Sequence, residues 1–328
     1  MAIPEAMLPG SGHSPPAAGA GNPASFVRRW CSFIRERFPL ASHIPMVAVF
    51  TAANGAAALY DAHGARLMSE PPAATVWLRA FLVTLVFFLR MRIFDEIKDL
   101  ETDLRFNPSR PLARGLISVA DAKRAITACV FVEFTLLLPS GSAAVAAWLP
   151  ALAYSFLMYK EFFIGPLIRP HLTTYALTHT VISIGIGFTI AATMTGAAFT
   201  QGPHAAIGWL ACINWMFFNV FEFSRKTYAA VEESPGVDTY SALFGSWGAW
   251  TLSASQIGLA LGAIYFTPAG ASQSLTFYAI AMAWVIPGLR YAFRPTARAA
   301  AVYRAASGVC IISFYAVLTL QFLTAFNP

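Results

Sequence analysis

The sequence has few charged side chains and no cysteine pattern typical of a disulfide scaffold or a zinc site. Only 12% of its 328 residues are charged, against about 25% in a soluble domain. The four cysteines are widely separated and form no CxxC or Cys/His spacing. The first 25 residues lack the charged start and apolar centre of a signal peptide. The net charge of +6 is not accompanied by a basic-aromatic patch, so the sequence does not indicate a nucleic-acid-binding protein.

Apolar residues are abundant instead, at 57% of the chain. They gather in stretches of roughly 20 residues, the length that a helix needs to cross the hydrocarbon core of a bilayer. The expected spans cover residues 41–60, 75–94, 119–138, 142–160, 174–198, 204–224, 243–266, 274–293 and 300–325. The sequence therefore predicts an all-α, polytopic membrane protein with nine transmembrane helices in a bundle.

The distribution of Lys and Arg predicts the orientation, because these residues gather in cytoplasmic segments. With nine spans and a cytoplasmic N-terminus, 20 of the 22 Lys and Arg residues fall on the cytoplasmic side. The C-terminus is then expected on the opposite side. Residues 1–25, rich in Pro, Gly and Ala, are expected to be a disordered cytoplasmic tail. Residues 26–328 are expected to form one transmembrane catalytic domain.

An acidic stretch, DEIKDLETD at residues 95–103, directly follows the second expected span. On a helix, Asp95, Asp99 and Asp103 are spaced to lie on nearly one face, with Glu96 beside them. Carboxylates this close repel one another. One interpretation is a solvated helix end in which neighbouring cations pair with the acids.

Cations in the same loop favour a second interpretation, since the chain continues as RFNPSRPLARG. Mg²⁺ prefers carboxylate oxygens and is usually completed by substrate phosphates. Arg110 and other nearby cations suit the remaining phosphate oxygens. The pattern predicts a metal-bridged diphosphate at the cytoplasmic mouth of the bundle, with an apolar tail housed behind it.

Polar residues recur on the same side after the fourth and sixth expected spans. Lys160 follows the fourth span. The loop after the sixth holds Glu222, Arg225, Lys226, Glu232, Glu233 and Asp238. Taken singly, each loop is equally consistent with an ordinary cytoplasmic flank. Three such loops on one side favour a common site, a cytoplasm-facing active-site cap.

Three polar residues inside expected spans are left out of this site. Glu133 is a lone intramembrane carboxylate, which by default suggests a function. A hydrogen bond to a neighbouring helix or a protonated state explains it equally well. His179 and Asn214 are interpreted as side chains that form hydrogen bonds between helices.

The arrangement of spans and acidic loops resembles the UbiA superfamily of intramembrane prenyltransferases over roughly residues 40–325. The family's first motif, Asn-Asp-x-x-Asp-x-x-x-Asp followed by Arg-Pro-Leu, corresponds to residues 95–103 and 110–112. Asp95 stands at the Asn position and Glu96 at the first Asp position. The second motif, normally Asp-x-x-x-Asp, has no direct counterpart, and its register among the acids after the sixth span is ambiguous.

The resemblance implies that Mg²⁺ ions held by the two motifs bind an isoprenoid diphosphate. The implied metal ligands are Asp95, Glu96, Asp99, Asp103, Glu222, Glu232 and Asp238. The implied diphosphate partners are Arg110, Tyr159, Lys160, Arg225 and Lys226, with Asp99, Asp103, Lys160 and Arg110 as the catalytic residues. The metal would neutralise the charge that develops as the allylic carbon–oxygen bond breaks.

Two reactions and one different class of function remain open at this point. Transfer of the prenyl group to an aromatic or other lipid-forming acceptor is the family's more frequent chemistry. Cyclisation of the prenyl diphosphate by its own double bonds, as in terpene cyclases, is the alternative. A transporter is a remote alternative, because ionisable residues collect at one membrane face rather than along a path through the bundle.

Overall fold

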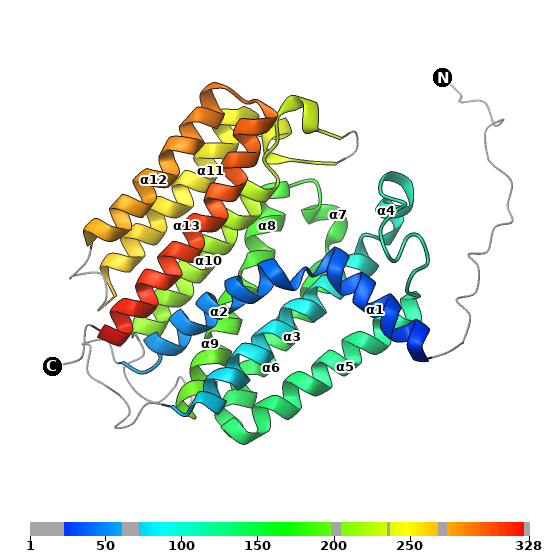
Figure 1. Cartoon of the computed structure of the whole chain (residues 1–328), viewed down its shortest axis with the longest axis vertical. Coiled ribbons are helices and arrows are strands. Elements are labelled where there is room, and N and C mark those ends of the chain that lie inside the picture. Colours follow the sequence, from blue (N-terminus) through cyan, green and yellow to red (C-terminus); the bar gives the residue numbers. More distant parts are fainter. Residues whose placement is uncertain (1–22, 61–71, 198–204, 235–236, 268–273, 325–328) are drawn as a thin grey trace, which may run out of the picture.

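The computed structural model describes residues 23–60, 72–197, 205–234, 237–267 and 274–324, and the regular elements in these ranges are helices (Figure 1). The long helices are α1 (Pro23–Arg37), α2 (Leu40–Ala57), α3 (Ala74–Lys98), α5 (Val119–Leu137), α6 (Ser142–Tyr159), α9 (Ile182–Thr195), α10 (Ala205–Arg225), α11 (Tyr240–Tyr265), α12 (Ser274–Phe293) and α13 (Ala297–Thr324). The short elements are α4 (Leu100–Phe106), α7 (Gly165–Ile168), α8 (Leu172–Thr180) and the 3₁₀ turns η1 (Leu138–Ser140), η2 (Glu161–Phe163) and η3 (Ala230–Glu232).

Each expected span coincides with a helix, and the span at 174–198 coincides with the pair α8 and α9. Six segments in the described part of the chain are long and apolar enough to cross a membrane. They are α2, α3, α6, α8 with α9, the 275–293 part of α12, and α13. Helix α5 is not among them, because its four charged side chains are spread over only 19 residues and leave no long stretch that is nearly free of charge. The all-helical membrane class is confirmed, and the count of nine spans stays a prediction.

The helices pack around a ring in which α2 and α9 hold the two halves together. Helices α10 to α13 pack in sequence, α13 packs on α2, and α9 packs on α10, α6 and α3. Figure 1 shows α10–α13 as one group of nearly parallel helices beside a second group containing α3, α5, α6 and α9. The contacts of α2 with α13 and of α9 with α3 therefore join helices that are distant in sequence.

The centre of the bundle is apolar and rich in aromatic rings. The Phe50 ring of α2 packs against the rings of Phe218 of α10 and Tyr315 of α13, with centres 5.5 Å and 5.6 Å away. Asn214 joins the same helices, since it donates to Asn54 at 2.8 Å and accepts from the Tyr315 hydroxyl at 3.0 Å. The interpretation of Asn214 as an interhelical hydrogen-bonding residue is confirmed.

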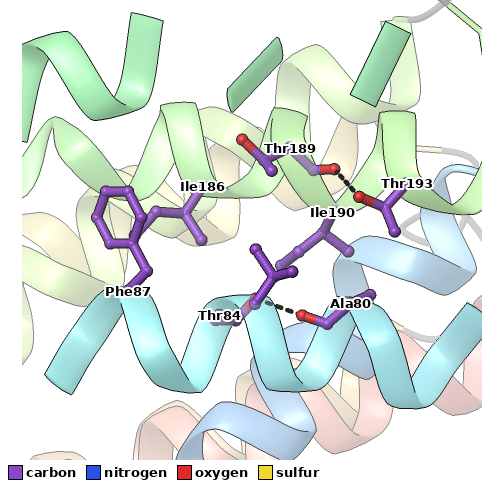
Figure 2. A pocket seen from close by; sticks show the side chains of 8 residues that line it. Ala80, Thr84, Phe87, Ile186, Thr189, Ile190 and Thr193 are labelled. Carbon is purple, nitrogen blue, oxygen red and sulfur yellow. Dashed lines mark hydrogen bonds between the residues drawn. The ribbon is translucent and has the colours of Figure 1, made fainter. Parts of the chain in front are cut away.

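A small cavity lies between α3 and α9 (Figure 2). Its volume is about 10 Å³, roughly the space of one water molecule. Its lining includes threonines whose hydroxyls donate to carbonyls of their own helix, as Thr84 does to Ala80 and Thr193 does to Thr189. Because these hydroxyls donate within their own helices, they are not free donors, and the other lining residues are apolar.

Two intramembrane charges neutralise each other between α3, α5 and α6. Arg90 donates to both Glu133 oxygens, at 2.7 Å and 3.1 Å, and both side chains are fully buried. Trp148 also donates to Glu133, at 2.8 Å, and Arg90 donates to Ser155 at 2.7 Å. The hydrogen-bond explanation of Glu133 is confirmed. Arg90, one of the 20 Lys and Arg residues that the sequence analysis counts on the cytoplasmic side, lies inside the bundle instead.

Helix α1 is not among the expected elements and lies against the end of α3 (Figure 1). Its Phe33 is buried against Ile93 and Phe94. Arg37 at its carboxyl end pairs with Glu96. The first residues of α1 overlap the expected tail, and the rest of that tail lies outside the described residues.

Candidate active site

The first acidic motif lies at the junction of α3 and α4, where Asp99 interrupts the helix. Helical backbone bonds continue across the junction, from Asp99 N to Asp95 O and from Asp103 N to Asp99 O, both at 2.8 Å. The four-residue spacing of the three aspartates along nearly one helical face is therefore preserved despite the break.

The outer two aspartates are engaged by cations and amides. Asp95 pairs with Lys98 at 3.2 Å and, at the longer distance of 3.8 Å, with Arg92. Asp103 is buried, and it accepts from Arg110 at 2.9 Å and from an amide, that of Asn107, at 3.2 Å. Arg110 thus lies at the motif, where it pairs with Asp103.

Asp99 lies between these two acids without any ion pair of its own to a described residue. Burial raises the pKa of Asp99, and the negative charges of Asp95 and Asp103 raise it further, against the opposing effect of Lys98. Asp99 is therefore a desolvated carboxylate beside two other acids and without an ion pair to a described residue, a setting that a bound cation would relieve.

Glu96 points away from this group. It is buried and paired with Arg37 of α1. Its second carboxylate oxygen, Oε2, is buried without a hydrogen-bond partner in the described structure. The arrangement gives Glu96 a role in fixing α1 to α3.

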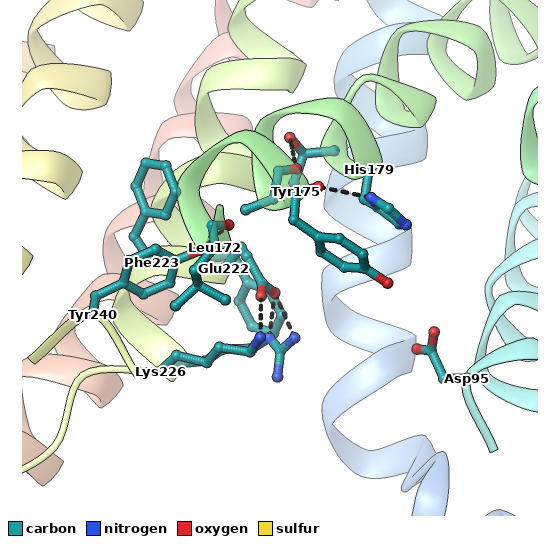
Figure 3. Close-up of polar contacts among 12 residues, drawn as sticks. Asp95, Leu172, Tyr175, His179, Glu222, Phe223, Lys226 and Tyr240 are labelled. Atoms are coloured by element: carbon teal, nitrogen blue, oxygen red, sulfur yellow. Dashed lines mark hydrogen bonds and ion pairs between the residues drawn. The ribbon is translucent and has the colours of Figure 1, made fainter. Parts of the chain in front are cut away.

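Glu222 stands at the end of α10, on the far side of the site from α3. It pairs with Arg225 at 2.5 Å and with Lys226 at 3.3 Å. Arg225 also interacts electrostatically with Asp95. Figure 3 shows Glu222 and Lys226 on one side and Asp95 on the other. The end of α10 and the first motif therefore face a common space.

The other acids of this loop have different surroundings. Glu232 pairs with Arg304 of α13 at 2.8 Å and accepts from the backbone N–H of Ala229 at 2.9 Å. Glu233 accepts from the hydroxyls of Thr239 and Ser241, so it shapes the loop. Asp238 is exposed. The structure brings only Glu222 of these candidates beside the first motif.

Tyr159 and Lys160 lie at the carboxyl end of α6. The Tyr159 ring stacks on Phe94 of α3, with centres 4.6 Å apart, and Lys160 is exposed with its ammonium 5.2 Å from the Tyr159 ring. This stacking places the end of α6 beside the last turns of α3. Lys160 has no acid partner among the described ion pairs.

Sequence reasoning missed a second layer of the site, formed by α8 and η2. The Lys98 ammonium lies 5.5 Å from the centre of the Tyr175 ring. The Tyr175 hydroxyl donates to Glu161 at 3.4 Å, and Glu161 is held by Arg169 at 2.8 Å. All three residues of η2 have positive φ, 49° for Glu161, so this turn is tight and strained. The sequence signal that could have indicated this layer is the presence of two polar side chains, Glu161 and Tyr175, next to or within an apolar span.

Within the described ranges, no three Asp, Glu, His or Cys side chains already converge as a metal site. The donor chemistry nevertheless fits Mg²⁺, because the uncompensated carboxylate Asp99 has oxygen donors on both sides. These carboxylates are the residues that would hold the ion. Cations on α3, α10 and the 107–118 loop pair with these acids.

This combination defines an all-helical membrane protein in which acidic and basic side chains gather at the ends of α3 and α10. Residues 48–308 match the model of the UbiA prenyltransferase family. The chain belongs to this family, as its resemblance in sequence implied. No curated protein matches the chain.

Solved structures of similar fold come from the same family. A digeranylgeranylglyceryl phosphate synthase superposes with a TM-score of 0.59 at 12% identity, over 90% of this chain and 98% of that one. An apo UbiA homologue from Aeropyrum pernix gives 0.58 at 14% identity, over 86% and 98%. A UbiA homologue from Archaeoglobus fulgidus bound to DMAPP and Mg²⁺ gives 0.51 at 13% identity, over 86% and 99%.

Proposed function

We propose that the protein is a Mg²⁺-dependent membrane enzyme that ionises an isoprenoid diphosphate and transfers the prenyl group to an aromatic or other lipid-forming acceptor. Asp99 carries the proposal, because it is a partly buried carboxylate that lies between two other acids at the end of α3 and has no ion pair to a described residue. Family membership supports it. The Archaeoglobus fulgidus homologue also binds DMAPP or GPP together with Mg²⁺.

Asp99 is the central metal ligand in this proposal, with Asp95 and Asp103 beside it and Glu222 opposite. Bound Mg²⁺ would neutralise charge on the departing diphosphate. Asp95 and Asp103 now hold cations that would turn to the phosphate oxygens instead. Glu96 and Glu232 are already committed to Arg37 and Arg304. Asp238 is exposed, so it contributes only if its loop folds inward.

The diphosphate would be held by the cations that line the cap. Arg110 and Lys98 flank the first motif, and Arg225 and Lys226 approach from α10. Arg side chains bind phosphate oxygens with two parallel hydrogen bonds, which fixes orientation as well as charge. Exposed Lys160 at the end of α6 is free to close over the substrate.

The apolar bundle would take the prenyl tail and keep water from the carbocation. Aromatic faces stabilise a cation, and Phe50, Phe88 and Phe218 form a cluster below the cap, with Phe88 and Phe218 stacked 5.8 Å apart. The cavity between α3 and α9 is far smaller than a prenyl chain, so the helices would separate to admit the tail. In this proposal the cap faces the cytoplasm, because the sequence predicts that most Lys and Arg residues lie on that side.

The test compares purified wild type with Asp99→Asn in lipid vesicles. Each is supplied with geranyl, farnesyl or geranylgeranyl diphosphate, Mg²⁺ and aromatic acceptors, and released diphosphate and extracted products are measured. A metal ion supplies several kcal/mol of charge stabilisation, and about 1.4 kcal/mol corresponds to tenfold in rate. We therefore expect Asp99→Asn to lower diphosphate release by about a hundredfold or more.

Glu101→Gln is the matched control, because Glu101 lies two residues away, is exposed and pairs only with Arg105 at 3.2 Å. Its activity should equal that of wild type, and chelator should abolish both. Equal activity of Asp99→Asn and wild type would contradict the metal assignment. A cyclic hydrocarbon formed without any acceptor would identify a terpene cyclase instead.

A further inference from the structure

His179 on α8 carries a buried ring nitrogen beside the site. Its Nδ1 lies 2.7 Å from the backbone carbonyl oxygen of Tyr175. A carbonyl oxygen only accepts, so Nδ1 carries the hydrogen, and in a neutral imidazole the lone pair then lies on Nε2. Nε2 is buried and has no hydrogen-bond partner in the described structure. A proton resting there would be a charged donor left unsatisfied, which is costly.

Neighbouring rings hold the imidazole in place. The Tyr175 ring stacks on it, with centres 3.9 Å apart and planes 20° apart, and the Phe162 ring meets it edge-on at 5.7 Å. The expected interhelical bond is not what holds His179, because its hydrogen bonds run to α8 itself. The lone pair is therefore fixed in direction without being used by the fold.

The ring lies on the side of α8 that faces the first motif. Figure 3 shows His179 and Tyr175 projecting from α8 towards the helix that carries Asp95. Lys98, Asp95 and Glu161 are close enough to interact with the ring electrostatically. The imidazole thus lies beside the acids and cations that, under the proposed function, hold the metal and the diphosphate.

A proton must leave whenever a prenyl carbocation is captured. The pair of electrons in the carbon–oxygen bond departs with the diphosphate, and the acceptor gives a pair to the allylic carbon. The acceptor's bond to hydrogen then breaks, leaves its electrons on the acceptor and releases a proton. The site's carboxylates are committed to cations or to metal, whereas the Nε2 lone pair of His179 is available.

We propose that His179 Nε2 accepts this proton, an inference that rests on the proposed function. The imidazolium formed would be attracted by Asp95 and Glu161 but repelled by Lys98, so it would hold the proton only briefly and pass it to water or diphosphate as the products leave. Ionisation of the prenyl diphosphate, which depends on the metal and the cap cations, precedes this step and does not require His179.

The test separates ionisation from capture by measuring two quantities in the same reaction. Diphosphate release reports ionisation, and the ratio of coupled product to prenyl alcohol reports whether the cation is captured productively or by water. In His179→Gln and His179→Ala we expect diphosphate release to be retained while coupled product falls about a hundredfold, the typical contribution of a positioned base.

His43→Ala is the control, because His43 has the same local geometry on α2. Its Nδ1 lies 2.9 Å from the Pro39 carbonyl, and its ring lies 4.0 Å from that of Phe38. Its product ratio should match that of wild type. An unchanged ratio in the His179 variants, or equal losses of both quantities, would overturn the assignment. A wild type that releases no diphosphate would instead overturn the proposed function.

A spectroscopic measurement checks the assignment without turnover. In ¹⁵N-histidine-labelled protein, the signal that disappears in His179→Gln should be that of a neutral imidazole with a protonated Nδ1 and a bare Nε2. A protonated Nε2 in that signal at neutral pH would refute the inference, because no lone pair would then be available.

Discussion

The buried pair of Arg90 and Glu133 gives the sharpest prediction about stability. Both side chains are fully buried, and two hydrogen bonds join them. Removing one partner of such a pair leaves an uncompensated buried charge and costs about 3–5 kcal/mol. We expect Arg90→Met to lower the free energy of unfolding by this amount, and Glu133→Leu to do the same.

The double variant Arg90→Met/Glu133→Leu should be much more stable than the sum of the single changes. Replacing both charges by apolar groups removes the desolvation penalty together with the attraction. The remaining loss comes mainly from the Trp148 N–H, which donates to Glu133 at 2.8 Å and would be left unsatisfied, a cost of about 1–3 kcal/mol. Ser155 keeps its own bond to the Leu152 carbonyl at 2.6 Å.

Reversible unfolding of the four proteins in mixed micelles, followed by tryptophan fluorescence, completes a double-mutant cycle. The conservative variant Thr135→Val on the exposed face of α5 serves as a control for substitution in this helix. A single-variant loss below about 1 kcal/mol, the value typical of exposed ion pairs, would refute the view that this pair is shielded from water.

Two further predictions follow from local contacts. Gly187→Ala would place a Cβ 2.7 Å from the side-chain amides of Asn54 and Asn214. We expect it to lower the free energy of unfolding by about 1–3 kcal/mol. Gly258→Ala meets nothing within 4 Å and should leave that free energy nearly unchanged in the same assay. Arg304 lowers the pKa of Glu232 below its usual 4.5, so this pair stabilises the protein above that value and loses its contribution as the pH falls through the lowered pKa. The melting difference between wild type and Arg304→Met should therefore be present at pH 7 and shrink below pH 4.5; a constant difference would exclude the charge pair as its cause.

Hydropathy predicted the positions of the helices well, because apolar runs of spanning length leave few alternatives. The shared face of the aspartates at residues 95–103 could be predicted equally well, since residues four apart lie on the same side of a helix. The ion-pair partners of individual charged residues could not be predicted from the sequence. Glu96 is paired across 59 positions of sequence and Glu232 across 72, and nothing local to either acid indicates such a partner.

One long-range pair did leave a trace in the sequence. Arg90 and Glu133 are charges of opposite sign in consecutive expected spans, and an intramembrane charge requires a partner. Counting Arg90 with the loop cations concealed this pairing. The roles of Tyr175 and His179 could not be predicted, because they depend on how α8 turns toward α3.

The attachment of α1 has a consequence for work with shortened forms of the chain. Arg37 pairs with buried Glu96 of α3, and Glu36 pairs with Arg114 at 2.8 Å, so this helix is joined both to α3 and to the loop that follows the acidic motif. A fragment starting at α2 would keep every bundle helix, but it would leave the buried Glu96 carboxylate without its Arg37 partner and Arg114 of the loop without Glu36. The smallest unit worth reconstituting therefore begins at α1, upstream of the matched family region.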